Sequence, residues 1–224
     1  KELGLFVAEG EKLIAHFLKL GLKAKYLIST NPEVQTLGFE IVNSADMKRM
    51  SFLNSASTAL AVFEIPKVVA LKNDIAFILI LDAIRDPGNM GTILRLCDWF
   101  GAHQILCTDD CVDVYNEKVV QASMGSVAVT AVFYRTRDEI SAFLTQNNYT
   151  VYGADIGQGS MYDTNYETKS ALILGNEGQG ISEILNHVIS KKITIPAAPN
   201  AKAESLNVAT AAAILLSDFV RKAG

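Results

Sequence analysis

The sequence predicts an α/β protein in two parts, a small N-terminal α/β unit followed by a larger domain built on a parallel sheet. From Ile75 onward, short apolar runs alternate with segments of helical periodicity, which is typical of parallel strands joined by crossover helices. Just before, residues 66–74 contain a proline and several charges, as expected of a domain boundary. The chain has 224 residues, of which 50% are hydrophobic, so it can build one sizeable core or two small ones.

The first 66 residues predict a compact unit of helices and strands. Apolar residues at helical spacing predict a helix over residues 9–20, and Gly21 ends it. We therefore assign residues 1–66 to a first domain and residues 67–74 to a linker. The other elements expected here are strands at residues 26–29, 39–42 and 59–65 and a small helix after Ser44.

Residues 75–224 predict the larger domain. The apolar run at residues 75–81 predicts a buried strand. Thr136, followed three residues later by Glu139, has the pattern of a capping box that opens a helix. The remaining expected elements are helices at residues 89–100, 116–124 and 205–222, and strands at residues 103–107, 127–134, 149–154, 171–174 and 192–195.

The last predicted helix, residues 205–222, carries apolar residues around most of its circumference. Such a helix requires burial on several sides. A deep core would provide it, and so would a core on one side with a second subunit on the other. The sequence leaves both open, so a homodimer is one of two possibilities.

The charge of the chain argues against a surface that binds polyanions all over, because the net charge is −4. Basic residues nevertheless cluster in the first part. They form either a local basic patch or a solvated helix face. The cluster consists of Lys19, Lys23, Lys25, Lys48 and Arg49.

Cysteine usage favours a reducing compartment. Cys97, Cys107 and Cys111 are odd in number and form no CxxC pair, and no signal peptide is visible, so we expect a cytoplasmic protein. The longest apolar runs fall far below the ~20 residues of a membrane span. The histidines and cysteines show no metal-ligand spacing, so we expect no metal site.

Three segments of the second domain have the composition of ligand-binding loops: residues 82–95, 172–180 and 195–208. Glycine and proline after a strand are ordinary in an α/β fold. Here, however, five polar residues fall in or just after such loops, where open α/β sheets gather their ligand sites. These candidates are Asn89, Arg95, Glu177, Ser205 and Asn207.

Each candidate also has a purely structural interpretation. Arg95 could pair with Asp98 or another surface acid, or its guanidinium could clamp a phosphate. Ser205 is a natural N-cap of the last helix, and Glu177 could face water. Asn207 is a poor helix former, which calls for a local reason. The residues alone leave these alternatives open.

Standard nucleotide-binding templates do not fit. No GxxxxGK[ST] motif is present, and Gly175, Gly178 and Gly180 run in the reverse order of the dinucleotide fingerprint, which argues against a nicotinamide enzyme. A glycine-rich loop still lets the backbone approach a flat ligand closely and read a purine edge.

The three loops together resemble the signature motifs of the SpoU (TrmH-like) RNA ribose 2′-O-methyltransferases of the SPOUT superfamily. The matching stretches are Asp86-Pro-Gly-Asn-Met-Gly-Thr-Ile-Leu-Arg95, Leu174-Gly-Asn-Glu-Gly-Gln-Gly-Ile181, and Ile195-Pro with Glu204-Ser-Leu-Asn-Val208. The order is that of the family, over roughly residues 75–222. The segment around Ser123-Met-Gly125 resembles a further family element. Phe6 to Leu13 resembles the ribosomal-protein-like RNA-binding domain often fused in front, a weaker match.

The resemblance implies a C-terminal trefoil knot, a homodimer, and S-adenosylmethionine as cofactor. It implies methylation of a ribose 2′-hydroxyl in structured RNA, with rRNA favoured over tRNA because of the front domain. By analogy, Arg95 contacts the RNA phosphate, Asn89 and Asn207 organise the site, and Glu177 and Ser205 support it. The implied cofactor contacts are Leu174, Gly175, Gly178, Gly180, Ile195, Pro196 and Leu206.

The sequence departs from the family pattern at a few positions. Ala209 stands where many relatives carry serine, Gln121 where a basic residue is common, and residues 57–60 where a Pro-Gln-Gly-like turn is frequent. Two alternatives to an rRNA methyltransferase therefore stay open: a tRNA substrate, and an RNA-binding protein that kept the fold without turnover.

Overall fold

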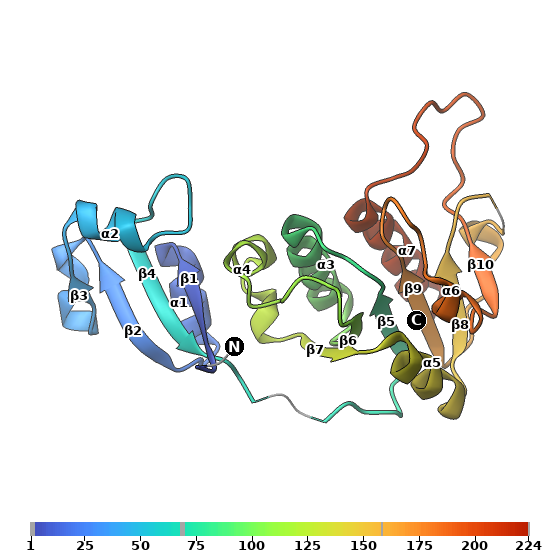
Figure 1. Cartoon of the computed structure of the whole chain (residues 1–224), viewed down its shortest axis with the longest axis horizontal. Helices are drawn as coiled ribbons and strands as arrows, with labels where there is room; N and C mark the ends of the chain where they lie inside the picture. The colour runs from blue at the N-terminus through green and yellow to red at the C-terminus, as the bar shows by residue number, and fades with distance from the viewer. Residues whose placement is uncertain (1–2, 68–69, 158, 224) are drawn as a thin grey trace.

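The protein, described here from a computed structural model over residues 3–67, 70–157 and 159–223, is an α/β fold with two sheets (Figure 1). The N-terminal part forms a four-stranded sheet in the order β1-β4-β2-β3. The C-terminal part forms a six-stranded sheet in the order β10-β8-β9-β5-β6-β7, and all its strand pairs are parallel. The predicted α/β class and parallel sheet are therefore confirmed.

The N-terminal sheet contains one strand that we did not predict, β1 (Leu5–Glu9), which pairs antiparallel with β4. The expected helix starts later than residue 9, because Gly10 has φ 100° and ψ 130°, which no helix accommodates. The rings of Phe6, Phe17 and Phe63 pack together in the core of this part. The other elements are α1 (Glu11–Lys19), β2 (Ala24–Ser29), a 3₁₀ helix (Pro32–Leu37), β3 (Glu40–Ile41), α2 (Ser44–Met50) and β4 (Ala59–Glu64).

The C-terminal sheet follows the predicted alternation of strands and helices. Its strands are β5 (Phe77–Leu81), β6 (Gln104–Thr108), β7 (Ala131–Arg135), β8 (Thr150–Ala154), β9 (Ser170–Leu174) and β10 (Lys191–Ile193). Its helices are α3 (Pro87–Phe100), α4 (Glu117–Ser123), α5 (Arg137–Gln146), α6 (Glu183–Asn186) and α7 (Val208–Ala223), with short 3₁₀ turns at Ser126–Ala128 and Met161–Asp163. The capping box of Thr136 and Glu139 at the start of α5 is confirmed.

Several predicted boundaries in the C-terminal part were wrong. The strand expected over residues 127–134 begins only at Ala131, because the carbonyl of Ser126 accepts hydrogen bonds from Val129 and Thr130 and closes a turn instead. The last helix begins at Val208 rather than at Ser205, since Asn207 and not Ser205 caps it. α3 also starts earlier than expected, at Pro87, where Asp86 caps it.

β5 lies inside the sheet and is buried on both faces. Ile78 and Ile80 pack with residues of α5 and α6, whereas Leu79 and Leu81 belong to the core beneath α3 and α7. Because successive side chains of a strand point to opposite faces, a continuous apolar run is what a covered parallel strand requires. The carboxyl end of β5 is thereby fixed in the middle of the sheet, and α3 starts just beyond it.

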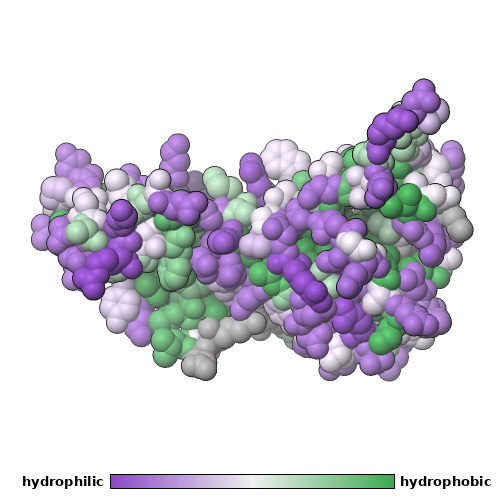
Figure 2. All heavy atoms as spheres, turned by 45° about the horizontal axis from the view of Figure 1, so that its top comes forward, coloured by the Kyte–Doolittle hydropathy of each residue, from purple (hydrophilic) through white to green (hydrophobic). Residues whose placement is uncertain are grey.

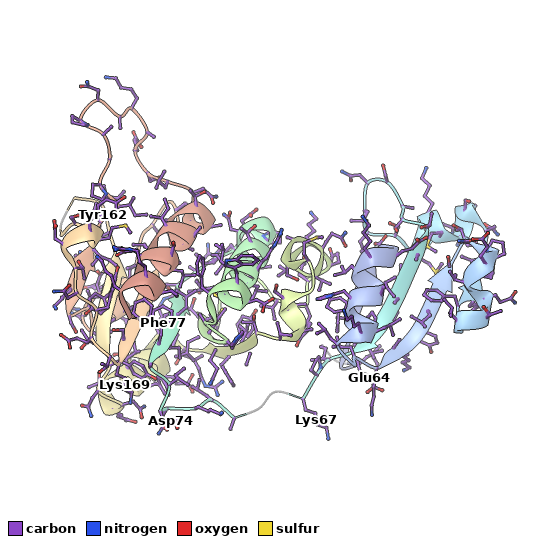
Figure 3. All side chains as sticks on the ribbon, turned by 180° about the vertical axis from the view of Figure 1, so that it is seen from behind. Glu64, Lys67, Asp74, Phe77, Tyr162 and Lys169 are labelled. Carbon is purple, nitrogen blue, oxygen red and sulfur yellow. The ribbon has the colours of Figure 1, made fainter. Side chains whose placement is uncertain are left out.

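The two parts of the chain touch each other away from the linker. Phe6 of β1 and Tyr115 have ring centroids 5.2 Å apart, and the backbone of Gly125 lies against the imidazole of His16. Figure 3 shows the connection running from Glu64 and Lys67 below one part to Asp74 and Phe77 at the other. Val68 and Val69, within the predicted linker, lie outside the described residues. Among the described residues, no helix has the length and hydropathy needed to cross a membrane.

The contact between α3 and α4 depends on Gly91. A Cβ atom at this position would lie 2.5 Å from the Cβ of Ala122 and 2.8 Å from the carbonyl oxygen of Val119. The carbonyl oxygen of Val119 is a backbone atom, which cannot move aside as a side chain can. α3 therefore approaches α4 as closely as it does only because residue 91 lacks a side chain.

Gly91→Ala should lower the free energy of unfolding by about 1–2 kcal/mol, because overpacking outweighs the helix-propensity gain of ~1 kcal/mol. Urea denaturation measures this. Thr92→Ala, at an exposed position on the same helix, serves as the control and should stay within about 0.5 kcal/mol of the parent. A Gly91→Ala protein more stable than the parent would contradict the close approach.

Candidate functional site

A cavity of about 660 Å³ opens among the loops that follow β8, β9 and β10 and the start of α7. Its walls come from residues 154–156, 174–180, 194–198, 201 and 203–206, closed by apolar residues of α7. Figure 1 shows the segment between β10 and α7 projecting from the body, and in Figure 2 its tip is hydrophilic while hydrophobic atoms gather at its base. The cavity lining contains all seven residues expected to contact a cofactor: Leu174, Gly175, Gly178, Gly180, Ile195, Pro196 and Leu206.

The glycine-rich loop after β9 folds back on itself. The backbone groups of Asn176 and Gly180 exchange two hydrogen bonds, of 3.1 and 2.8 Å, and the Asn176 side-chain oxygen accepts from the N–H groups of Gly178 and Gln179. Gly180 adopts φ +69°, and a Cβ on Gly175 would collide with the Gly180 carbonyl group. Glycine at these two positions is what lets the loop form a thin wall of the cavity.

Three of the predicted polar residues meet in one hydrogen-bonded chain at this edge. Asn89 donates from Nδ2 to Oε1 of Glu177 (2.5 Å), and Asn207 donates from Nδ2 to Oδ1 of Asn89 (2.8 Å). Asn207 Oδ1 also accepts from the N–H groups of Ala209 and Thr210, which supplies the local reason for its position at the start of α7. Residues from all three loops thus come together.

Arg95 and Ser205 do not join this chain. Arg95 is exposed on α3, and within the described residues it has no hydrogen-bond or ion-pair partner. The expected alternative pairing with Asp98 is absent there, since Asp98 accepts a hydrogen bond from Ser126 (2.8 Å). Ser205 lines the cavity and is exposed. The guanidinium of Arg95 is therefore available to an anionic ligand.

Sequence reasoning missed the contribution of β8 to the cavity. Ala154, Asp155 and Ile156, at the carboxyl end of this strand, line it together with the glycine-rich loop. The hydrogen bond from Lys192, 2.6 Å away, lowers the pKa of Asp155 below its ordinary value. The signal was available, because the ends of parallel strands share one edge, but no motif marks these residues.

The site offers polar groups of distinct kinds beside an apolar cavity. Amide groups of two asparagines and one carboxylate are held in a fixed chain. The guanidinium of Arg95, unpaired within the part of the chain that the structure describes, lies on the same helix as Asn89. Among the described residues, no three His, Cys, Asp or Glu side chains are grouped so as to hold a metal ion. The arrangement suits orientation and charge stabilisation of a ligand.

Comparison with known proteins identifies the family. The model of the SpoU rRNA Methylase family matches residues 76–217. The chain belongs to this family. The SpoU match covers the whole six-stranded sheet and most of α7.

Individual relatives extend the similarity beyond the SpoU segment. The chain is 29% identical over 221 residues to the 23S rRNA (guanosine(2553)-2′-O)-methyltransferase RlmP of Bacillus subtilis, covering 94% of this chain and 86% of that protein. A TrmH-family protein of Porphyromonas gingivalis superposes with a TM-score of 0.84 at 34% identity, over 98% of this chain and 91% of the other. An AdoMet-bound rRNA methyltransferase of Sinorhizobium meliloti gives a TM-score of 0.83 at 27% identity, over 98% and 88%.

Substitutions at Asn207 test how much its side chain stabilises the start of α7. Asn207→Asp keeps the oxygen that caps α7, and a negative charge suits a helix N-terminus, whereas Asn207→Ala loses the cap. We expect Asn207→Ala to have a free energy of unfolding about 1 kcal/mol below that of Asn207→Asp. Chemical denaturation measures it, with Asn207→Ser as a second variant that retains a cap. Equal stability of the Ala and Asp variants would contradict the cap.

Proposed function

We propose that this protein methylates a ribose 2′-hydroxyl of rRNA with S-adenosylmethionine (AdoMet) as methyl donor. The observation that carries the proposal is the Glu177-Asn89-Asn207 chain at the edge of the cavity, in a chain of the SpoU family. Relatives named as 23S rRNA 2′-O-methyltransferases support rRNA as the substrate.

The cavity fits AdoMet in size and chemistry. It is lined mainly by apolar groups and by the backbone of a glycine-rich loop, which can read a purine edge, while Glu177 places a carboxylate in its wall. AdoMet supplies, when bound, a methyl group on a positively charged sulfonium. The seven residues named above would hold it, and Glu177 favours a cationic ligand.

The hydrogen-bonded chain of Glu177, Asn89 and Asn207 is suited to orienting a hydroxyl group. Asn89 is fixed from both sides, by Glu177 and by Asn207, so its amide cannot rotate freely. Holding two reactants in contact supplies much of the rate of a displacement reaction. Asn89 and Asn207 therefore position the ribose, and Glu177 supports them through its hydrogen bond with Asn89. Ser205 supports the site from the cavity lining.

Arg95 stabilises negative charge. Its guanidinium, free of partners within the described residues, can bind an RNA phosphate and the oxygen that becomes negative during the reaction. We do not assign it the role of general base, because an arginine side chain stays protonated in proteins.

We further propose the architecture that this function requires. Residues 75–224 form a SpoU-type methyltransferase domain with a C-terminal trefoil knot, and residues 1–66, joined by the linker 67–74, bind the RNA substrate. Support for the knot comes from the segments 174–180 and 194–206, which line one cavity although β9 and β10 lie on opposite sides of β8. Three free cysteines support a cytoplasmic location.

The same proposal includes a homodimer that covers α3 and α7. Trp99, on α3, is 84% exposed, and Val220, on the neighbouring α7, is 42% exposed. The outer stripe of α7 also contains small residues, among them Ala213 and Ser217. Exposed apolar side chains on two neighbouring helices favour a protein interface there.

Methyl transfer from labelled AdoMet to unmodified RNA tests the activity. The parent protein should label rRNA, and nuclease digestion should release a 2′-O-methylated nucleoside. Arg95→Ala should lower the rate by about 10²–10³-fold while AdoMet binding persists. Arg135→Ala, at an exposed arginine of β7 that is not part of the cavity lining or of α3 and α7, is the matched control and should keep the activity.

Two other outcomes would replace the proposal. Labelling of tRNA in preference to rRNA would change the substrate. AdoMet and RNA binding without transfer to rRNA, to tRNA or to ribosomal assembly intermediates would indicate an RNA-binding protein without turnover.

Trp99→Glu should convert the dimer to a monomer, because a charge buried in an interface without a partner is costly. Sedimentation velocity of both proteins at equal concentration measures this. Tyr26→Glu, at an exposed aromatic residue of the N-terminal part, is the control and should leave the parent's oligomeric state unchanged. A parent protein that sediments as a monomer would rule out the dimer.

A further inference from the structure

One buried aspartate connects the loop after β5 to the loop that walls the cavity. The side chain of Asp82 is 1% exposed. Its Oδ2 accepts from the backbone N–H of Ser182 (2.7 Å), at the end of the glycine-rich loop, and its own N–H donates to the carbonyl of Leu174 (2.9 Å), at the beginning of that loop. Asp82 therefore touches both ends of the loop.

The next residue, Ala83, adds a second connection. It adopts the left-handed region with φ 57°, which an alanine rarely does. In this conformation its carbonyl accepts from Nδ2 of Asn176 (3.0 Å), while its N–H donates to Oγ1 of Thr108 (2.8 Å). Asn176 in turn fixes the backbone of Gly178 and Gln179. The shape of the cavity wall thus depends on residues 82 and 83.

Arg137, the first residue of α5, holds the other oxygen of Asp82. The Nε and Nη2 atoms of Arg137 lie 3.0 Å and 2.8 Å, respectively, from Oδ1 of Asp82. Arg137 also pairs with Asp110 at 3.0 Å, and Asp110 pairs with Arg85 at 3.0 Å. Two carboxylates and two guanidinium groups pair with each other, so the buried carboxylate of Asp82 has a cationic partner.

Asp110 shows the strength of this cluster. Partial burial acts to raise its pKa, but hydrogen bonds from Thr108, Arg137 and Arg85 outweigh burial and lower the pKa of Asp110 to about 2. At neutral pH the carboxylate of Asp110 is therefore charged and can pair with both arginines.

We propose that Asp82, held by Arg137, is a positioning residue for AdoMet: it fixes the cavity wall relative to Asn89. This inference rests on the proposed function. Asn89 lies in the first turn of α3, just after the short connection that starts at Asp82. Its partner Glu177 lies in the wall that Asp82 and Ala83 hold. Asp82 itself does not touch the cavity, since it is absent from the lining.

Asp82→Asn tests the inference, because an amide presents one acceptor oxygen where two are used. Titration calorimetry with AdoMet gives the affinity, and single-turnover methyl transfer gives the rate. We expect AdoMet to bind about 10-fold more weakly, as is usual when a residue that orients a binding group is lost, and the rate to fall by up to about 100-fold. Arg137→Met should have the same effect and Arg137→Lys a smaller one.

Asp218→Asn is the matched control. Asp218 is also buried and paired with cations, Arg221 and Lys222. It lies near the end of α7, and its remaining hydrogen bond comes from Tyr166 rather than from either loop. All variants are measured at a temperature at which circular dichroism shows them folded. We expect Asp218→Asn to lower the melting temperature while leaving AdoMet affinity within about two-fold of the parent.

Several results would overturn the inference. Parent-like AdoMet affinity and rate in Asp82→Asn would do so, as would an equal loss of affinity in Asp218→Asn. Should Asp82→Asn not fold, the two Arg137 variants decide by the same criteria. A parent that binds AdoMet but methylates no RNA would refute only the proposed function. The AdoMet affinities of the variants would still test whether Asp82 positions the cavity wall. A parent that binds no AdoMet would overturn both.

Discussion

The common direction of the six strands in the C-terminal sheet is the constraint on which the site depends. Because all six strands are parallel, their carboxyl ends lie along one edge of the sheet, and every loop that follows a strand starts there. The strand β5, buried on both faces, fixes the centre of that edge, and β9 and β8 continue it on one side. Asn89, Glu177 and Asn207, far apart in sequence, meet there because each follows a different strand.

Much of this organisation could be predicted from the sequence, and the reasons are local. The apolar run before Asp82 is typical of a covered parallel strand, and Thr136 with Glu139 specifies a helix start through two reciprocal hydrogen bonds. The seven residues expected around the cofactor line one cavity, which the motif order indicated. Which ligand they hold stays a prediction.

The errors arose where a tertiary contact decides a local choice. β1 was not expected because a five-residue strand gains its stability from pairing with β4, which lies more than fifty positions away. Ser205 has the right chemistry for an N-cap, but Asn207 takes that role while also bonding to Asn89. Asp155 and Ile156 carry no motif, and only the neighbouring strands bring them to the cavity. No local pattern contains such information.

The pairing of the arginines near the carboxyl ends of the strands indicates how a protein with a net negative charge can bind RNA. In and beside the loop after β5, Arg85 and Arg137 pair with Asp110 and Asp82, so these charges largely cancel each other. On α3, Arg95 has no such partner within the described residues and keeps its full charge for a ligand. Since exposed charges are screened over about 8–10 Å at physiological salt, a phosphate would respond to this guanidinium and not to the net charge of −4. Local pairing, rather than overall composition, decides where this surface attracts an anion.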